Sequence, residues 1–311
     1  MQLPYYLNEK INGLYKELNK KALESTREAV TKRYKEQTGK SQSLISSKQD
    51  SIVYALSRMP ATFSVICTLL GQLKEQGLLE GINSVIDIGS GTGAAYFAIN
   101  ELDSSIDVTC VERDKNMIDV FKVLSDGKDV VNADFTKDLI DKKADMVMSS
   151  YVISEMTELD RQNSVLKMLE MSDNYVLLID TGTPRTYENF MRLKSHITSL
   201  GYNVIAPCMH EKCGLINDYC QFYARVERTS LLKMAKAGSL SYEDEKYFYL
   251  LISQKDCNFT AKRVIRRPII KENNIELALC TNNGVDKVNF TKKNKEEFKR
   301  VKKIKINDIL D

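Results

Sequence analysis

The fold is decided by residues 84–93, which read SVIDIGSGTG. A short apolar run leads into a glycine-rich turn, and the helix-compatible residues 94–98 follow the turn. Glycine permits positive φ and a close approach of the backbone to a ligand, and a helix N-terminus offers unpaired N–H groups. The stretch therefore predicts a buried strand, a ligand-binding turn and a helix.

Outward from this stretch, short apolar runs alternate with helical segments. The predicted strands are residues 84–88, 107–111, 144–148, 175–179, 202–206 and 247–253. Strands that alternate with helices are typical of a doubly wound α/β sheet. We expect such a domain over residues 81–254, with a cysteine-rich insertion at 207–244.

The two ends of the chain have different patterns. Residues 1–80 predict a helical N-terminal region, with apolar residues at helical spacing over 8–38 and a second helical stretch over 52–76 that Pro60 interrupts. Residues 255–311 predict a small, basic, β-rich extension, with strands at 263–270, 275–280 and 285–290 before a basic helix or tail.

Charge is uneven along the 311 residues, although the net charge is only +3. Residues 1–50 hold 10 Lys and Arg against 6 Asp and Glu, and residues 255–311 hold 15 against 8. Basic ends suit a polyanionic partner such as nucleic acid, or simply keep the chain soluble. No run of about 18 apolar residues and no signal-peptide pattern is present, so we expect no membrane span and a reducing cytoplasmic location.

The spacing of the glycines separates two kinds of nucleotide loop. A dinucleotide fingerprint is G-x-G-x-x-G, whereas here Gly89, Gly91 and Gly93 alternate and Asp87 stands two residues ahead of them. The Asp-x-Gly-x-Gly-x-Gly form resembles the S-adenosylmethionine loop of class I methyltransferases. Glu112, at the end of the next predicted strand, can accept both ribose hydroxyls of a nucleoside.

The predicted cofactor site extends to the ends of the next strands. Asp134 follows the third strand, where the methyltransferase superfamily often contacts adenine, and Ser149 ends the fourth. The cofactor-binding residues that we predict are Asp87, Gly89, Ser90, Gly91, Thr92, Gly93, Glu112, Asp134 and Ser149.

No catalytic residue is predicted. Amino-directed base methyltransferases carry Asp/Asn-Pro-Pro-aromatic after the fourth strand, and residues 149–152 of this chain are SSYV. The pairs Pro207-Cys208 and Thr109-Cys110 imitate those of cytosine-C5 RNA enzymes but occupy the wrong strands. Tyr151 and Glu155 lie near the expected substrate face.

Three of the seven cysteines, Cys208, Cys213 and Cys220, fall within thirteen residues. In a reducing compartment such clustering indicates metal ligation or catalysis more than disulfides. A fourth ligand must come from elsewhere, and the candidates are His210, Cys257 and Cys280. Zinc remains possible, but the absence of Cys-x-x-Cys pairs favours an iron–sulfur cluster.

Several segments together resemble one family, the methyltransferase-like proteins of the small ribosomal subunit of bacteria and mitochondria. They are residues 54–63 (YALSRMPATF), 87–93, 150–155 (SYVISE), 182–184 (GTP), 206–210 (APCMH), 242–246 (YEDEK), 263–268 (RVIRRP) and 279–280 (LC). The chain departs from the family pattern at Gly214, at Gln221 and at residues 306–308.

This resemblance implies a class I methyltransferase fold, contact with small-subunit rRNA and a [4Fe–4S] cluster on Cys208, Cys213, Cys220 and Cys280. In this fold we expect the strand over 202–206 to run parallel to its neighbours, so that Cys208 leaves the sheet at the cofactor edge. The phosphate-contact candidates are then Arg263, Arg266, Arg267, Lys292, Lys293, Lys295, Lys299, Arg300, Lys302, Lys303 and Lys305.

We therefore expect a monomeric S-adenosylmethionine-dependent methyltransferase-like protein that acts on the small ribosomal subunit or helps to assemble it. Two alternatives stay open. One is a non-catalytic assembly factor with the same ligands, and the other is a zinc-containing methyltransferase of a small molecule or protein.

Overall fold

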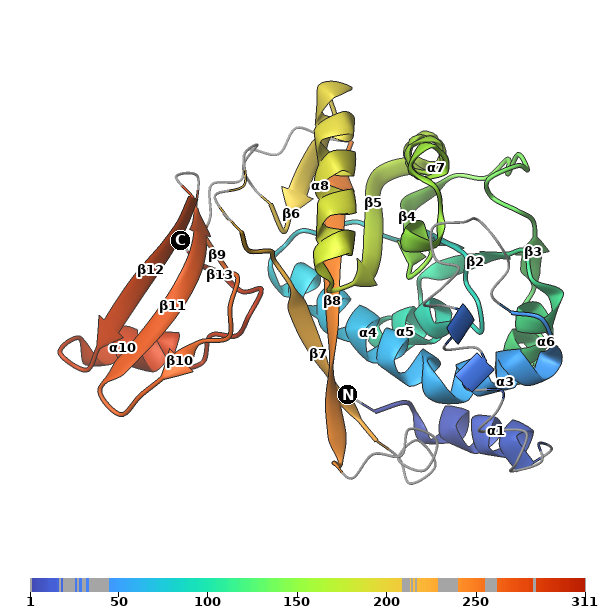
Figure 1. Ribbon diagram of the computed structural model, residues 1–311, viewed down its shortest axis with the longest axis horizontal. Helices are drawn as coiled ribbons and strands as arrows, with labels where there is room; N and C mark the ends of the chain where they lie inside the picture. Colours follow the sequence, from blue (N-terminus) through green and yellow to red (C-terminus); the bar gives the residue numbers. More distant parts are fainter. Residues whose placement is uncertain are drawn as a thin grey trace.

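The described part of the chain centres on an eight-stranded sheet of order β3-β2-β1-β4-β5-β8-β6, with β7 paired to β8 (Figure 1). Its strands are β1 (Ser84–Ile88), β2 (Asp107–Glu112), β3 (Val130–Asn132), β4 (Ala144–Ser150), β5 (Ser172–Thr181), β6 (Asn203–Ala206), β7 (Phe222–Glu227) and β8 (Tyr242–Ser253). Strands β1 to β5 are parallel, and β8 is antiparallel to β5, β6 and β7.

The structure is a computed structural model. It describes residues 2–16, 18, 26, 28–29, 32–33, 45–208, 213, 215, 217–228, 240–254, 262–281 and 284–310. His210, Cys257 and most of the helix predicted over 8–38 lie outside these residues.

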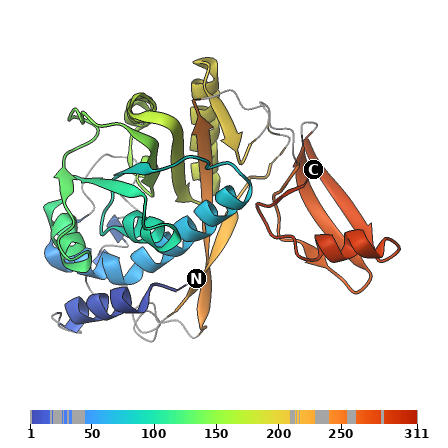
Figure 2. The ribbon, with the colours of Figure 1, turned by 180° about the vertical axis from the view of Figure 1, so that it is seen from behind.

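Helices cover both faces of the central sheet. Helices α4 and α5 lie on one face, whereas α7 and α8 lie on the other (Figures 1 and 2). The described helices of this part are α1 (Tyr5–Lys16), α3 (Lys48–Ser57), α4 (Met59–Glu75), α5 (Ala94–Leu102), α6 (Lys115–Leu124), the 3₁₀ turn η1 (Ile153–Glu155), α7 (Glu158–Met171) and α8 (Pro184–Ser199). Local chemistry sets where they start: Asp114 accepts two backbone N–H bonds at the start of α6, and Thr183 caps α8 ahead of Pro184.

A second sheet of order β10-β11-β9-β13, with β12 paired to β11, forms from the C-terminal residues. Its elements are β9 (Lys262–Val264), β10 (Ile269–Ile270), β11 (Asn274–Thr281), β12 (Gly284–Thr291), α10 (Lys295–Val301) and β13 (Ile309–Leu310). It has a small core of its own around Leu277 and Phe298. Gln72 of α4 and Gln76, the residue at its C-cap, bind this sheet, because their side-chain amides donate to the carbonyl oxygens of Ile306 and Asn307, each at 2.9 Å.

These elements confirm the predicted α/β class, and the sheet order with one antiparallel strand is that of the class I methyltransferase fold. Pro60 lies in the first turn of α4, immediately after a break at Arg58, as its missing N–H requires. The predicted domain boundaries remain predictions.

One expectation about the sheet is wrong. Strand β6 does not lie among parallel neighbours, because it pairs with antiparallel β8. It nevertheless points the same way as β5, since both are antiparallel to β8, so its carboxyl end still lies at the edge where β1, β2 and β4 end.

No single described helix is long and apolar enough to cross a membrane. Helices α3 and α4 pass on length and composition only as a pair, bent by 47° at the break between them. Both bury most of their residues in the core of the protein.

Candidate functional site

A pocket opens at the carboxyl ends of β1 to β4, and it holds about 890 Å³ of space when its opening to solvent is included. Its walls include Ile88, Gly89, Gly91, Glu112, Arg113, Asp134, Phe135, Ser150, Tyr151, Val152, Glu155 and Met156. Ligands of doubly wound sheets bind at this edge. The pocket therefore lies where the sequence predicts the cofactor.

The three glycines of the loop meet different surroundings, although all three have positive φ. A Cβ on Gly89 would lie 2.5 Å from a methyl carbon of Val152, and one on Gly93 would lie 2.2 Å from the Phe121 ring. A Cβ on Gly91 would meet no atom of the described residues within 4 Å. Two of the glycines thus permit close packing, whereas Gly91 leaves open space beside the pocket.

Buried polar atoms without partners lie around this loop. Both carboxylate oxygens of Asp87 and the hydroxyls of Ser90 and Thr92 make no hydrogen bond within the described part of the chain. Burial, together with the nearby Glu112, raises the pKa of Asp87 to about 7. Buried polar groups are normally satisfied, so this group of unpartnered atoms sets the loop apart from the rest of the core.

Glu112 is held by the backbone of the loop and of its own strand end. Its Oε2 accepts from Gly91 N at 2.9 Å, and its Oε1 accepts from the N–H groups of Arg113 and Asp114 at 2.8 Å each. A carboxylate oxygen has room for about two hydrogen bonds, so Oε2 retains acceptor capacity toward the pocket. Glu112 thus fits the predicted role of accepting ribose hydroxyls.

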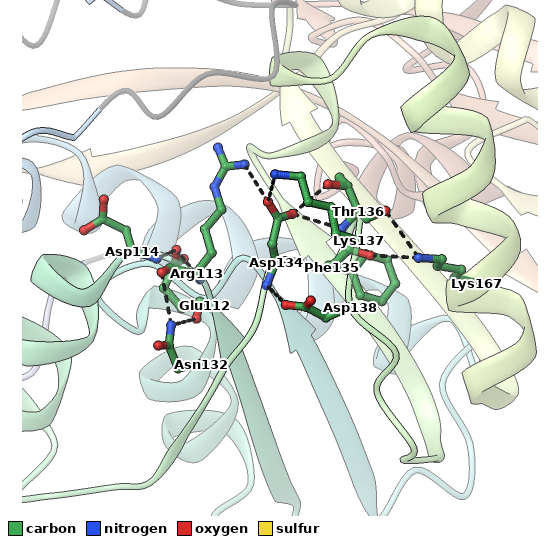
Figure 3. Close-up of polar contacts among 10 residues, drawn as sticks. All are labelled: Glu112, Arg113, Asp114, Asn132, Asp134, Phe135, Thr136, Lys137, Asp138 and Lys167. Carbon is green, nitrogen blue, oxygen red and sulfur yellow. Dashed lines mark hydrogen bonds and ion pairs between the residues drawn. The ribbon is translucent and has the colours of Figure 1, made fainter.

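Asp134 also lines the pocket and is surrounded by donors (Figure 3). Its Oδ1 accepts from the Thr136 hydroxyl at 2.6 Å, and its Oδ2 lies 3.3 Å from Lys137 Nζ and 3.6 Å from Arg113 Nη1. Burial opposes ionisation of Asp134, but the hydrogen bonds from Thr136 and Lys137 and the charge of Arg113 outweigh it and lower its pKa. Asp134 is therefore ionised, and its hydrogen bonds and ion pairs hold the wall of the pocket in place beside Phe135.

The predicted cofactor residues fall into two groups. Gly89, Gly91, Glu112 and Asp134 line the pocket, whereas Asp87, Ser90, Thr92 and Gly93 lie behind its wall. Ser149 is buried, and its hydroxyl donates to Ile88 O at 3.1 Å, so the structure gives it a bond between β4 and β1. Its neighbours Ser150 and Tyr151 line the pocket instead.

Tyr151 stands on the pocket wall in a strained conformation. Its φ is 60°, which is uncommon for a residue other than glycine, and its buried hydroxyl has no hydrogen-bond partner among the residues described. The guanidinium of Arg58 lies 5.8 Å from the centre of its ring and forms an ion pair with Glu245 at 3.1 Å. Strain of this kind concentrates at functional sites, and here it lies at the end of β4 on the wall of the pocket.

Glu155 is a carboxyl group on the same wall of the pocket as Tyr151, at the end of β4. Burial and the nearby carboxylate of Asp180 raise its pKa to about 8. Asp180 is itself buried and accepts from Ser154 N and the Ser154 hydroxyl, both at 2.9 Å. Glu155 can therefore hold or release a proton near neutral pH.

The four predicted cysteine ligands are neighbours. Burial, followed by the thiols of Cys208, Cys280 and Cys213, raises the pKa of Cys220, and burial with Cys208 and Cys213 raises that of Cys280 to about 12. The Tyr187 hydroxyl donates to Cys213 Sγ at 2.9 Å. The strand that carries Cys280 lies more than fifty residues beyond Cys220, so the fold itself brings these thiols together.

The thiols do not form a finished coordination site. Among the described residues, no group of three or more His, Cys, Asp or Glu side chains is arranged so that it could hold a metal ion. The shifted pKa values of the thiols and the absence of a metal-holding arrangement agree, because one charge influences another over a longer distance than a metal–sulfur bond of about 2.3 Å.

The phosphate contacts predicted around β9 need correction. Arg263 is completely buried, so it cannot meet a phosphate at the surface. Arg266 pairs with Asp218, and Arg267 pairs with Asp244 at 2.8 Å while lying over the ring of Tyr223. The other phosphate-contact candidates are exposed and lie on α10 and its flanks: Lys292, Lys293, Lys295, Lys299, Arg300, Lys302, Lys303 and Lys305.

The sheet order, the glycine loop and the pocket define a protein of the S-adenosylmethionine-dependent methyltransferase-like class. The chain belongs to the Rsm22 family, whose model, described as mitochondrial small ribosomal subunit Rsm22, matches residues 48–311. This match confirms the resemblance that the sequence motifs indicate. No curated protein matches the chain.

Solved structures similar to this chain include three methyltransferases. A putative RNA methyltransferase, PH1948 from Pyrococcus horikoshii, is 18% identical, with 76% of this chain and 98% of that chain covered and a TM-score of 0.41. Magnesium protoporphyrin IX methyltransferase from Synechocystis PCC 6803 with bound SAM is 12% identical, with 76% and 94% covered and a TM-score of 0.41. The plantazolicin methyltransferase BpumL is 12% identical, with 80% and 99% covered and a TM-score of 0.46.

Sequence reasoning misses several residues of these sites. Arg58 lies in the quoted segment 54–63 but was not predicted as a site residue, and Arg113 carries no motif of its own, although it follows the predicted Glu112. Lys194 had a detectable signal, since it shares the apolar face of α8 with Phe190 and Ile197 and is only 5% exposed.

Proposed function

We propose that the chain binds S-adenosylmethionine in the pocket at the carboxyl ends of β1 to β4. The observation that carries this proposal is the pocket itself, which Gly89, Gly91, Glu112 and Asp134 line and in which Gly91 N donates to the carboxylate of Glu112. Glu112 would accept the ribose hydroxyls, and Phe135 and Asp134 would border the base. When bound, this cofactor supplies a methyl group on a positively charged sulfur.

The binding itself is tested by calorimetric titration of the full chain with S-adenosylmethionine and, in parallel, with NAD. We expect saturable binding of S-adenosylmethionine at micromolar concentration and none of NAD. Tight binding of NAD alone would contradict the assignment of the loop.

The partner that we propose is the RNA of the small ribosomal subunit. Family membership supports this partner, as does the basic surface of α10 and its flanks. Cationic side chains on one face neutralise phosphates, and such binding weakens as salt rises. Retention of the purified chain on small-subunit particles at low salt, and its release at high salt, tests the partner.

We also propose that Cys208, Cys213, Cys220 and Cys280 hold a metal group, an iron–sulfur cluster rather than zinc. The mutual proximity of these thiols and the donor set of four sulfurs support it. Anaerobic purification followed by an absorption spectrum and by iron, sulfide and zinc analysis separates the two. A colourless protein with one zinc would refute the cluster.

We propose that methyl transfer, where the chain catalyses it, takes place at the end of β4. A substrate that enters beside Tyr151 would meet Glu155, which can take up a proton that the methylated atom releases. Incubation of small-subunit particles with methyl-labelled S-adenosylmethionine should give label in rRNA with the wild-type chain and at least tenfold less with Glu155→Gln.

The second function is assembly without transfer. It is favoured by residues 149–152, because SSYV lacks the Asp/Asn-Pro-Pro-aromatic motif of amino-directed base methyltransferases. Tight cofactor binding with no incorporation of label into any particle would establish this second function and exclude the first.

A further inference from the structure

Strands β7 and β8 form a two-stranded ribbon with one buried face and one exposed face (Figure 1). Residues 222–227 of β7 pair with residues 242–247 of β8. Side chains alternate between the two faces along a strand, and Phe222, Ala224 and Val226 are the ones that β7 buries. The residues between them therefore lie on the exposed face, which belongs neither to the cofactor pocket nor to the basic surface of α10.

Two arginine guanidiniums on this exposed face lie over tyrosine rings. The guanidinium carbon of Arg225 is 4.0 Å from the ring centre of Tyr242, and that of Arg267 is 4.1 Å from the ring centre of Tyr223. Arg267 belongs to the connection between β9 and β10, so the C-terminal sheet contributes to this face. Distances this short bring each guanidinium into van der Waals contact with its ring, and the flat face of a guanidinium is the part that stacks.

One carboxylate holds both guanidiniums in place. Asp244 accepts from Arg225 Nε at 3.0 Å and from Arg225 Nη2 at 3.4 Å, and it accepts from Arg267 Nη2 at 2.8 Å. The N–H groups of a guanidinium lie in its plane, so these bonds occupy edges and leave flat faces uncovered. The side chains of Arg225 and Arg267 are 51% and 57% exposed, so solvent reaches them. We call this set of residues the Arg–Tyr strip: Tyr223, Arg225, Tyr242, Asp244 and Arg267.

Unpaired bases are the ligands that suit flat, fixed and solvated cations. Bases of single-stranded RNA stack on aromatic rings and on guanidinium planes, whereas the bases of a duplex stack on one another. The charges on this face also suit a polyanion, because three cations stand against two carboxylates: Arg225, Lys246 and Arg267 against Glu227 and Asp244. We propose that the Arg–Tyr strip binds unpaired bases of single-stranded RNA. This inference rests on the RNA partner proposed above and names the part of the RNA that the chain recognises.

Strand β8 connects the strip to the wall of the cofactor pocket. Glu245 stands between Asp244 and Lys246, and its carboxylate forms an ion pair with Arg58 at 3.1 Å. The guanidinium of Arg58 lies 5.8 Å from the ring centre of Tyr151, which lines the pocket. This part of β8 extends past the carboxyl ends of the parallel strands. A base on the strip would therefore lie at the edge of the sheet at which the pocket opens.

The test measures, by fluorescence anisotropy, binding of the full chain to an unstructured RNA strand of about ten nucleotides and to the same strand annealed to its complement. The double variant Arg225→Lys with Arg267→Lys keeps both charges and removes both flat groups. Loss of a stacked base lowers affinity by about fivefold or more, so the Kd for the single strand should rise at least that much. The Kd for the duplex and the slope of log K against log salt should stay at the wild-type values, because no phosphate contact is lost.

Arg192→Lys is the matched control, because Arg192 of α8 is also an exposed arginine that pairs with a carboxylate, that of Glu158. It should bind both RNAs as the wild type does. The double variant Tyr223→Leu with Tyr242→Leu is the second variant in case the arginine pair disturbs the ribbon. It removes the rings beneath the guanidiniums but keeps apolar contact, and it too should raise the Kd for the single strand. Thermal melting of each variant checks that the fold is kept.

Three results would overturn the inference: unchanged affinity of the arginine pair for the single strand, equal loss for single strand and duplex, or a smaller salt slope, which would make the arginines phosphate contacts. A wild-type chain that ignores the single strand, but that the arginine pair releases from small-subunit particles, would also overturn it, because the strip would then contact a protein. A wild-type chain that binds the single strand through the strip but is not retained on small-subunit particles would refute only the ribosomal partner.

Discussion

Alanine at Gly91 and alanine at Gly93 should damage different properties of the protein, although the two glycines are two residues apart. Both have positive φ, at 55° and 90°. The Cβ of alanine at Gly93 would overlap the buried ring of Phe121 at 2.2 Å, whereas at Gly91 it would enter open space beside the pocket. Gly93→Ala should therefore lower stability, and Gly91→Ala should lower cofactor affinity.

The magnitudes follow from the same geometry. An alanine held in the left-handed region costs about 1–2 kcal/mol, and both variants bear this cost. Overpacking in a rigid core adds about 1–3 kcal/mol, which only Gly93→Ala bears, because Phe121 is fully buried and in edge-to-face contact with Phe97. At about 2 °C per kcal/mol for a chain of this size, Tm should fall by about 4–10 °C for Gly93→Ala and by about 2–4 °C for Gly91→Ala.

Binding should rank the variants in the opposite order. One extra carbon in a fitted pocket costs about 1–3 kcal/mol of binding free energy, so Gly91→Ala should raise the Kd for S-adenosylmethionine about tenfold or more. Thermal melting gives the first ranking, and calorimetry well below either Tm gives the second. If Gly91→Ala melts lower than Gly93→Ala, or binds the cofactor as tightly as the wild type, the account of this loop is wrong.

Three further predictions concern acids of the pocket and the basic surface. Asp87 has its pKa raised to about 7 by burial and then by Glu112, so the native state binds a proton more tightly than the unfolded chain. The stabilising effect of the bound proton is complete below about pH 4 and is lost as pH rises through about 7. Tm should therefore fall between pH 5 and pH 8, and Asp87→Asn should make that fall smaller. An unchanged slope of Tm against pH in the variant would contradict a buried acid at this position. Glu112→Gln should weaken S-adenosylmethionine binding by about tenfold because it removes the anionic acceptor of the ribose, whereas calorimetry of Glu101→Gln, on the exposed end of α5, should show wild-type affinity. The double change Lys302→Gln with Lys303→Gln should reduce the slope of log K against log salt for rRNA binding by about 0.7–0.9 for each phosphate that the protein no longer neutralises, and a slope equal to the wild type would place the RNA elsewhere.

The cofactor edge was predictable because its determinants are local. A strand, its glycine turn and the following helix are adjacent in sequence, and the acid at the end of β2 lies at a fixed distance along the chain. The pairing of β1 with β2 then brings Gly91 and Glu112 into hydrogen-bond contact, as the strand order requires. Ser149 shows the limit of this reasoning, because its place at a strand end does not reveal that its hydroxyl points to the neighbouring strand.

Arg263 shows what local reasoning cannot provide. A basic residue in a basic region resembles a phosphate contact, and nothing within its own segment indicates otherwise. Its burial arises from α4, from residues near the C-terminus and from the loop after β6, which are remote in sequence. Lys194 differs, since helical spacing alone places it among buried apolar residues and so predicts a buried charge.

The reversal of one strand explains why the cysteine segment begins at the same edge of the sheet as the pocket. Strand β8 is antiparallel to β5, and Tyr247 pairs with Thr181, so the residues before Tyr247 extend past the carboxyl edge of the parallel strands. Strand β7, which begins two residues after Cys220, pairs with that extension, with Phe222 opposite Tyr247. The connection from β6 to β8 must therefore cross the same edge, and the reversed strand brings Glu245 to Arg58 on the pocket wall. A parallel strand in the place of β8 would begin at the opposite edge, and the connection that carries the cysteines would then have to cross the length of the sheet.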